Sequence, residues 1–208
     1  MPIESIITFI FASIVLIISP GPDLIFVITQ SAINGSRTGI LVTLGLCTGL
    51  IAHTSAVAFG VAALLQTSEL AFTILKTLGA IYLLYLAWQA FHAHSNKLQA
   101  EKNISKTAIQ LYRRGILMNL TNPKVTIFFL AFLPQFVSTE NGSIASQVFI
   151  LGAIFMALGL ILFIVISLVA GKLGSWLNRS EMAQVYLNRF AALVFVGLAA
   201  KLLTSNNH

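Results

Sequence analysis

The sequence has 208 residues, of which 57% are hydrophobic and only 9% are charged. Soluble domains carry roughly 25% charged residues, so this composition excludes a soluble globular protein and indicates an integral membrane protein. The single cysteine excludes a disulfide framework within the chain and a dithiol redox pair. The net charge of +6 does not indicate nucleic-acid binding, because the distribution of the basic residues has a membrane explanation.

Six apolar segments are long enough to span a bilayer, which takes about 20 residues each. In chain order they cover residues 4–32, 39–65, 69–91, 112–137, 144–170 and 185–203. The N-terminal end has no basic segment, so we expect it to begin the first span rather than a cleaved signal. We therefore predict an all-α membrane protein with six transmembrane helices. It forms a single integral membrane domain over 1–208, with a first half at 1–91, a basic loop at 92–111 and a second half at 112–208.

The basic residues predict the orientation of these spans. With six spans, most lysines and arginines fall in loops on one side of the membrane: Arg37, Lys97, Lys102, Lys106, Arg113, Arg114, Lys172, Arg179 and Arg189. Lys76 and Lys201 fall on the other side, each near a helix end from which it can extend to the interface. The positive-inside rule then places the basic loops in the cytoplasm and both termini outside.

Residues 19–23, with the sequence Ser-Pro-Gly-Pro-Asp, interrupt the first apolar segment. Pro20 and Pro22 cannot continue an α-helix, because proline has no backbone N–H and its ring clashes with the preceding turn. Gly21 adds conformational freedom at the same point. Asp23 follows at once, in a stretch that we expect to lie in lipid. A helix break that carries a charge indicates a binding site, since unwound backbone at this depth is tolerated only inside protein or around a cavity.

A second interruption lies in the fourth segment at residues 119–124, with the sequence Asn-Leu-Thr-Asn-Pro-Lys. Pro123 disfavours helical backbone at Asn122, and Lys124 follows the proline as an aspartate follows the earlier one. Each half also carries an Asn-Gly-Ser turn before its second span. We therefore predict two inverted three-helix halves, each with its first helix broken at proline. Paired interruptions of this kind are the best sequence indication of a transporter's binding site.

Asp23 and Lys124 are the charged residues that we expect deepest in the membrane, at similar depth and with opposite signs. A lone charge at mid-bilayer costs about 2.5–3.5 kcal/mol on insertion scales, so pairing would relieve both and predicts contact between the halves. The pair either only holds the two helices together, or it binds the substrate or a coupling proton. Backbone N–H groups freed at the breaks suit a carboxylate, and freed carbonyls suit an ammonium group or a cation. With Asn119 and Asn122, these groups would form a site for a zwitterion.

Two features of the second span have more than one interpretation. Gly45 and Gly49 have the Gly-x-x-x-Gly spacing that lets helices approach closely, either within the chain or in a homodimer. His53 continues the same stripe near mid-membrane, where it is either a proton carrier or a buried structural residue. Enzyme signatures and clustered Cys and His ligands are absent from the sequence, so we expect no enzyme activity, cofactor or metal site.

The motif at 19–23 resembles the signature of the lysine exporter (LysE) superfamily. The motif at 119–124, followed by Pro-Gln-Phe at 134–136, resembles the homoserine/threonine resistance (RhtB) branch of that superfamily. The resemblance covers essentially the whole chain. It implies a multi-pass protein of the bacterial inner membrane that exports an amino acid or amino-acid derivative by antiport with protons. Which amino acid is carried does not follow from the sequence.

We therefore predict a secondary transporter whose partners are a small-molecule amino-acid substrate, protons and membrane lipid, with no nucleic acid. The predicted substrate-binding residues are Pro20, Gly21, Pro22, Asp23, Asn119, Asn122, Pro123 and Lys124. Asp23 and His53 are the predicted proton-coupling residues. Two alternatives stay open: a cation-coupled exchanger or channel, in which the freed carbonyls hold a metal ion, and a membrane scaffold without transport activity.

Overall fold

A computed structural model of the chain describes residues 1–61, 69–92, 107–177 and 181–204. These residues form eight α-helices and no strand, which confirms the predicted all-α fold. The helices are α1 (Ile3–Ile18), α2 (Pro22–Asn34), α3 (Ser36–Ala56), α5 (Glu69–His92), α6 (Ala108–Leu120), α7 (Pro123–Ile127), α8 (Ile144–Leu177) and α9 (Glu181–Thr204). Two π-helical segments, η1 (Val57–Val61) and η2 (Phe128–Phe132), extend α3 and α7, and two short 3-10 turns follow, η3 (Leu133–Phe136) and η4 (Thr139–Asn141).

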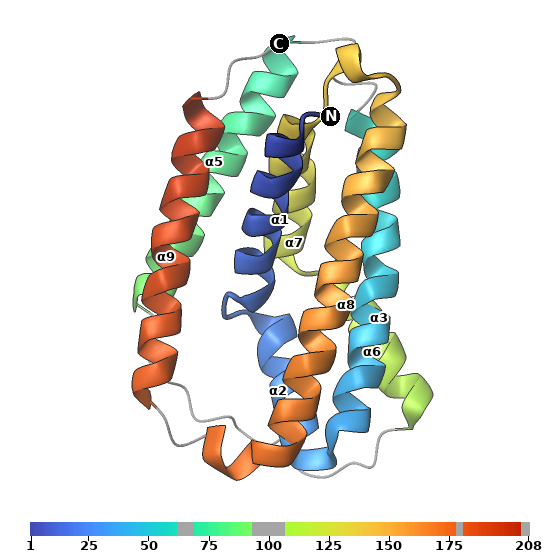
Figure 1. Cartoon of the computed structure of the whole chain (residues 1–208), viewed down its shortest axis with the longest axis vertical. Coiled ribbons are helices and arrows are strands. Elements are labelled where there is room, and N and C mark those ends of the chain that lie inside the picture. Colours follow the sequence, from blue (N-terminus) through green and yellow to red (C-terminus); the bar gives the residue numbers. More distant parts are fainter. Residues whose placement is uncertain (62–68, 93–106, 178–180, 205–208) are drawn as a thin grey trace.

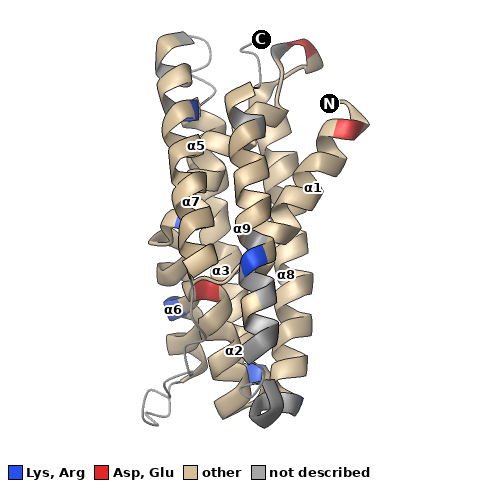
Figure 2. Ribbon diagram, turned by 90° about the vertical axis from the view of Figure 1, so that its left-hand side faces the viewer, with Lys and Arg blue, Asp and Glu red and all other residues tan. Residues whose placement is uncertain are grey.

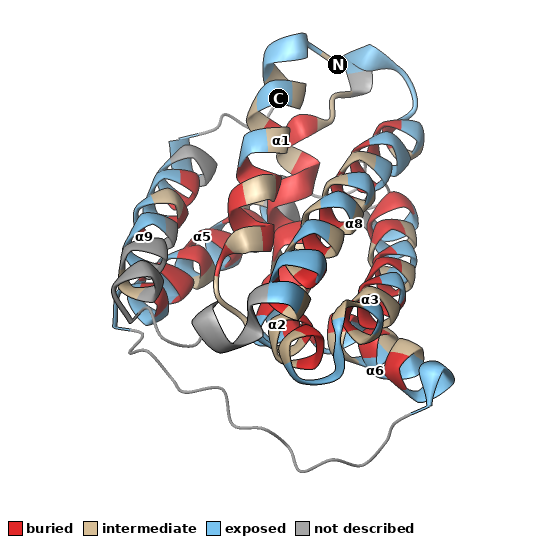
Figure 3. Cartoon of the chain, turned by 60° about the horizontal axis from the view of Figure 1, so that its bottom comes forward, coloured by how far each residue is buried: buried red, intermediate tan, exposed pale blue. Residues whose placement is uncertain are grey.

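The helices stand roughly parallel in an elongated bundle (Figure 1). The helices α1, α2 and α7 lie between two groups, α5 with α9 on one side and α3, α6 and α8 on the other (Figures 1 and 3). Most of the described ribbon is uncharged, as Figure 2 shows. The buried residues face the centre of the bundle, and α1 begins at the same end at which α9 finishes (Figures 1 and 3).

Both predicted helix breaks are confirmed. The pair α1 and α2 is bent by 56° around residues 19–21, and the pair formed by α6 and Pro123–Phe136 is bent by 49°. Ser36–Gly60 and Ile144–Lys172 are each long and apolar enough to cross a membrane unbroken. The described residues therefore contain two candidate spans, or four if each bent pair is counted as one. The predicted total of six spans in two repeats stays a prediction.

Two boundaries differ from those predicted. The helix expected to begin at residue 112 begins at Ala108, because Thr107 and Gln110 form a capping box in which each side chain accepts a hydrogen bond from the other residue's backbone N–H. The span expected to end at residue 170 continues in α8 to Leu177, since no proline follows to stop the helix. The predicted basic loop at 92–111 lies largely outside the described residues.

The helices α3 and α6 pack closely against each other at their glycines. A Cβ atom on Gly45 would meet the backbone carbonyl of Tyr112 and would lie 3.0 Å from the Cα atom of Gly115. A Cβ atom on Gly49 would lie 2.8 Å from the side chain of Asn119. The Gly45–Gly49 stripe is therefore a contact surface within the chain, and the predicted homodimer stays a prediction.

A cluster of buried phenylalanines fills the bundle between the helix breaks and the end at which α1 begins. Its members are Phe9, Phe128, Phe129, Phe132, Phe136 and Phe155. The ring centroids of Phe9 and Phe136 are 5.3 Å apart, and those of Phe128 and Phe155 are also 5.3 Å apart. This aromatic cluster joins α1, the segment after Pro123, and α8. It closes the centre of the bundle on that side.

Candidate functional site where the two helix breaks meet

The two breaks are built alike. Pro22 and Pro123 each occupy the start of the helix that follows the break, where a backbone N–H would have no intrahelical partner. Both prolines are exposed, whereas the charged residues that follow them, Asp23 and Lys124, are only 4% and 6% exposed. Each break therefore turns its charge towards the centre of the bundle.

The Lys124 ammonium group binds backbone carbonyls at the first break. Its Nζ atom donates hydrogen bonds to the carbonyl oxygens of Leu16 and Ser19, each at 3.0 Å. In an unbroken helix the carbonyl of Leu16 would accept the N–H of residue 20, and Pro20 has none. The ammonium group also lies at the carboxyl end of α1, where the helix dipole favours positive charge. Lys124 therefore replaces the missing amide donors of the opposite half.

The second break is bound in the same way by His53. The Nε2 atom of His53 lies 3.1 Å from the carbonyl oxygen of Asn119, which Pro123 leaves without its helical donor. Because a carbonyl oxygen only accepts, Nε2 carries the proton and donates it to this hydrogen bond. The backbone N–H of Asn122 donates to the same oxygen at 3.1 Å. His53 and Lys124 thus each bind a carbonyl that a proline has freed in the other half.

Asp23 and Lys124 act on each other electrostatically, but the hydrogen bonds of Lys124 do not go to Asp23. The structure records the ammonium group on the two carbonyls instead, because these lie at the break itself and lack other donors. The predicted contact between the halves is present, but it runs through the backbone. Lys124 and His53 act electrostatically on the Asp23 carboxyl group, and the Asn122 amide lies beside it. Its Oδ1 atom is buried and has no hydrogen-bond partner.

Three unpartnered polar atoms surround this junction. They are Oδ1 of Asp23, Oδ1 of Asn119 and Nδ2 of Asn122, and their residues are 4%, 3% and 2% exposed. The other amide atom of Asn122 accepts the backbone N–H of Lys124 at 3.0 Å and so caps α7. Buried polar groups in proteins almost always have partners, and the Asn122 amide lies beside the Asp23 carboxyl group, so these residues form one buried polar cluster between the two breaks.

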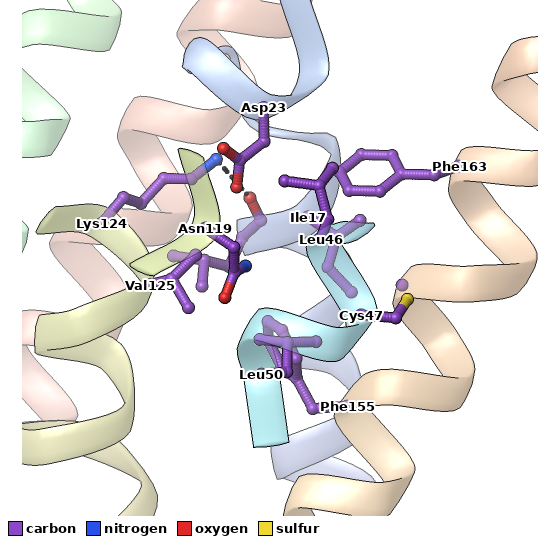
Figure 4. A pocket seen from close by; sticks show the side chains of 12 residues that line it. Ile17, Asp23, Leu46, Cys47, Leu50, Asn119, Lys124, Val125, Phe155 and Phe163 are labelled. Atoms are coloured by element: carbon purple, nitrogen blue, oxygen red, sulfur yellow. Dashed lines mark hydrogen bonds between the residues drawn. The ribbon is translucent and has the colours of Figure 1, made fainter. Parts of the chain in front are cut away.

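A small cavity opens at the same place (Figure 4). It has room for a single water molecule and is too small for an amino acid. Its polar wall consists of Asp23, Asn119 and Lys124. The remaining wall is made by Leu16, Ile17, Leu46, Cys47, Leu50, Val125, Phe155, Gly159 and Phe163.

Sequence reasoning missed part of this site. The carbonyls of Leu16 and Ser19 could have been inferred, because a proline four residues after Leu16 frees that carbonyl. The apolar wall from α3 and α8 gave no signal, since buried and lipid-facing apolar residues look alike in a membrane sequence. Gly21 has a specific role: a Cβ atom there would lie 3.0 Å from Nζ of Lys124, so glycine leaves room for the lysine.

An all-helical membrane protein in which two broken helices meet at a buried polar site has the architecture of a secondary transporter. The chain belongs to the LysE type translocator family, which it matches over residues 14–206. The family resemblance found in the sequence motifs is thereby confirmed.

Individual relatives match the chain from end to end. A homoserine/homoserine lactone efflux protein of Salmonella typhimurium is 31% identical over 100% of both chains. A leucine efflux protein of Klebsiella pneumoniae is 30% identical over 95% of this chain and 94% of its own length. An uncharacterised membrane protein of Bacillus subtilis is 28% identical over 95% and 98%. No solved structure matches the chain.

Proposed function

We propose that this protein exports an amino acid or amino-acid derivative across the bacterial inner membrane, in exchange for protons. Membership of the translocator family supports the transport function, and the names of the two efflux relatives support the substrate class. The observation that carries the proposal is the junction of the two breaks. There Lys124 binds the carbonyls of Leu16 and Ser19, beside three buried polar atoms without partners.

In this proposal the chain is one transporter domain of six spans with both termini outside the cytoplasm. The first half consists of α1 with α2, then α3, then α5. The second half consists of α6 with the segment up to Phe136, then α8, then α9. The two bent pairs at the start of each half support the inverted repeat. The helices α5 and α9 are the two remaining spans in this proposal. Each has 24 residues and is therefore about 36 Å long at 1.5 Å per residue.

The junction provides complementary partners for a zwitterion. Oδ1 of Asp23 and Oδ1 of Asn119 accept hydrogen bonds from a substrate ammonium group, as do the carbonyls that Lys124 now occupies. Lys124 and Nδ2 of Asn122 donate to a substrate carboxylate. Binding therefore proceeds by exchange: the substrate ammonium group displaces Lys124 from the carbonyls of α1, and the released lysine binds the substrate carboxylate.

Proton coupling follows from the same exchange. A proton from outside that binds Asp23 removes a negative charge from the junction, and one that binds His53 adds a positive charge. Either change alters the affinity of the junction for the substrate ammonium group. After substrate has left, Lys124 returns to the carbonyls and the site closes. The aromatic cluster around Phe128 separates the closed site from the outer end. It has to part before substrate can leave on that side.

Inside-out membrane vesicles test this function directly. Vesicles that contain the protein should accumulate radiolabelled amino acids from a mixed panel, and a protonophore should abolish the accumulation. Phe11→Ala provides a matched control for expression, because Phe11 lies on α1 but is 55% exposed. Accumulation that persists in the presence of the protonophore would show that protons do not drive export. A protein that accumulates no member of the panel is not an amino-acid exporter.

A further inference from the structure

We propose that the site accepts amino acids with a neutral, apolar side chain, and that it prefers the free zwitterion to lactones and esters. This inference rests on the proposed export function and names the substrate class of the same site. It follows from which charges and which apolar side chains face the cavity between the two breaks.

The first argument is a balance of charges. Among the residues that line the cavity, Asp23 is the acidic one and Lys124 is the basic one. The ammonium and carboxylate groups of a zwitterion use both of these partners. A third charge, on the substrate side chain, would be buried without a counter-charge, which is strongly unfavourable at this depth. A lactone or ester has no carboxylate, so it would leave Lys124 without a partner.

The second argument is the position of the apolar wall. Figure 4 shows Asp23, Lys124 and Asn119 together at one side of the cavity, and Phe163, Cys47 and Phe155 away from them. A substrate held by its charged groups at the polar side therefore directs its side chain towards α3 and α8. The Cys47 thiol is the most polar group of that wall, and it already lies 3.9 Å from the carbonyl oxygen of Met156. A hydrocarbon side chain fits this surface better than a hydroxyl group.

Gly159 provides room for the side chain when the site opens. It lies in the wall formed by α8, and a Cβ atom there would meet only Cδ1 of Ile17, at 4.0 Å. A methyl group at this position is therefore compatible with the closed fold. In the open site the same methyl group would occupy space that a long substrate side chain needs. Gly159 thus sets the length of side chain that the site accepts.

Substrate pairs that differ in a single group test the charge balance without mutating the protein. Norleucine and lysine share a carbon chain, and lysine adds one ammonium group. In the vesicle assay the wild-type protein should prefer norleucine by on the order of a hundredfold, as expected for one uncompensated buried charge. It should also prefer homoserine to homoserine lactone. Equal transport of lysine, or preference for the lactone, would overturn the inference while leaving the export function intact. Transport of no amino acid would overturn both.

Two variants test whether the substrate side chain lies against the apolar wall. Cys47→Asp adds a second carboxylate where the substrate side chain should lie, so the ratio of lysine to norleucine transport should rise about tenfold over that of the isosteric Cys47→Asn. Gly159→Ala should lower transport of norleucine relative to alanine. If Cys47→Asp does not fold, the Gly159 variant and the wild-type substrate pairs still decide the matter. Unchanged ratios in folded variants would show that the side chain does not lie against this wall.

Discussion

The Nε2 atom of His53 lies 3.1 Å from the backbone carbonyl oxygen of Asn119, across the boundary between the two halves. Lys124 makes the reciprocal contact with Leu16 at 3.0 Å. In both cases the carbonyl belongs to the residue four positions before a proline and therefore lacks its helical donor. Each half of the protein thus supplies the hydrogen bond that the other half's break requires.

His53 provides the first test of this reciprocal arrangement. In His53→Gln, the glutamine amide places a donor near the position of Nε2 but does not titrate, so the contact with Asn119 should survive. In His53→Phe the donor is lost, and stability should fall by about 1 kcal/mol, because the carbonyl keeps its second hydrogen bond from Asn122. Thermal unfolding in detergent measures the difference between the two variants.

The pH profile of export separates a structural histidine from a proton carrier. If His53 carries the coupling proton, His53→Gln should lose the pH dependence of export that the wild-type protein shows. A wild-type profile in His53→Gln would assign the proton to another residue, of which Asp23 is the first candidate. Equal stability of the Gln and Phe variants would contradict the hydrogen bond itself.

Lys124 and Asp23 provide the second test. Lys124→Met keeps the length of the side chain but leaves two carbonyls without donors and Asp23 without a compensating charge. The expected loss of stability is about 3–5 kcal/mol, as for other buried charges that lose their partner. The double variant Asp23→Asn with Lys124→Met should recover part of that loss, because no lone charge remains. It should still fail to export, since the groups that bind the zwitterion are gone.

Chemical denaturation of the single and double variants measures the energetic coupling between these residues. A coupling energy near zero would mean that Asp23 and Lys124 do not sense each other, in spite of their common position at the junction. Export by the double variant at the wild-type rate would contradict the assignment of either residue to the substrate site.

The sequence was sufficient to predict where the helices break, because proline acts on its own backbone and the preceding turn. It was also sufficient to predict that Asp23 and Lys124 approach each other, because lone charges in a membrane need compensation. It did not predict that the hydrogen bonds of Lys124 go to the carbonyls of Leu16 and Ser19. A freed backbone carbonyl is not marked by any particular residue type, so the sequence does not reveal it as an acceptor for a lysine.

Other features depend on packing that a single sequence does not encode locally. Gly45 and Gly49 have the same spacing whether they face another helix of the chain or a second copy. Only the position of α6 shows that they face Gly115 and Asn119. Phe155 likewise carries no sequence signal that separates a cavity wall from a lipid-facing surface. Its role follows from where α8 lies relative to both breaks.

Gly45 tests the close crossing of α3 and α6. In Gly45→Ala the added methyl group would meet the backbone of Tyr112, which cannot rotate away as a side chain could. The two helices would have to separate, at a cost of about 1–3 kcal/mol. Gly197→Ala is the matched control, because a Cβ atom on Gly197 would meet nothing within 4 Å. It should be neutral or slightly stabilising in thermal unfolding, and equal losses in both variants would rule out the proposed crossing as their cause.

Phe9 tests whether the aromatic cluster closes the bundle at the end where α1 begins, which is the outer end in the proposed orientation. Phe9 is fully buried against Phe128 and Phe136, so Phe9→Ala should leave a cavity and cost about 3 kcal/mol of stability. Phe11→Ala, two residues further along the same helix, removes an exposed ring and should cost much less.

A weakened cluster should also open more often. We therefore expect Cys47, which lines the cavity and is the chain's single cysteine, to react faster with a membrane-impermeant maleimide added from outside in Phe9→Ala than in Phe11→Ala. Equal labelling rates in the two folded variants would show that another part of the bundle closes the outer path.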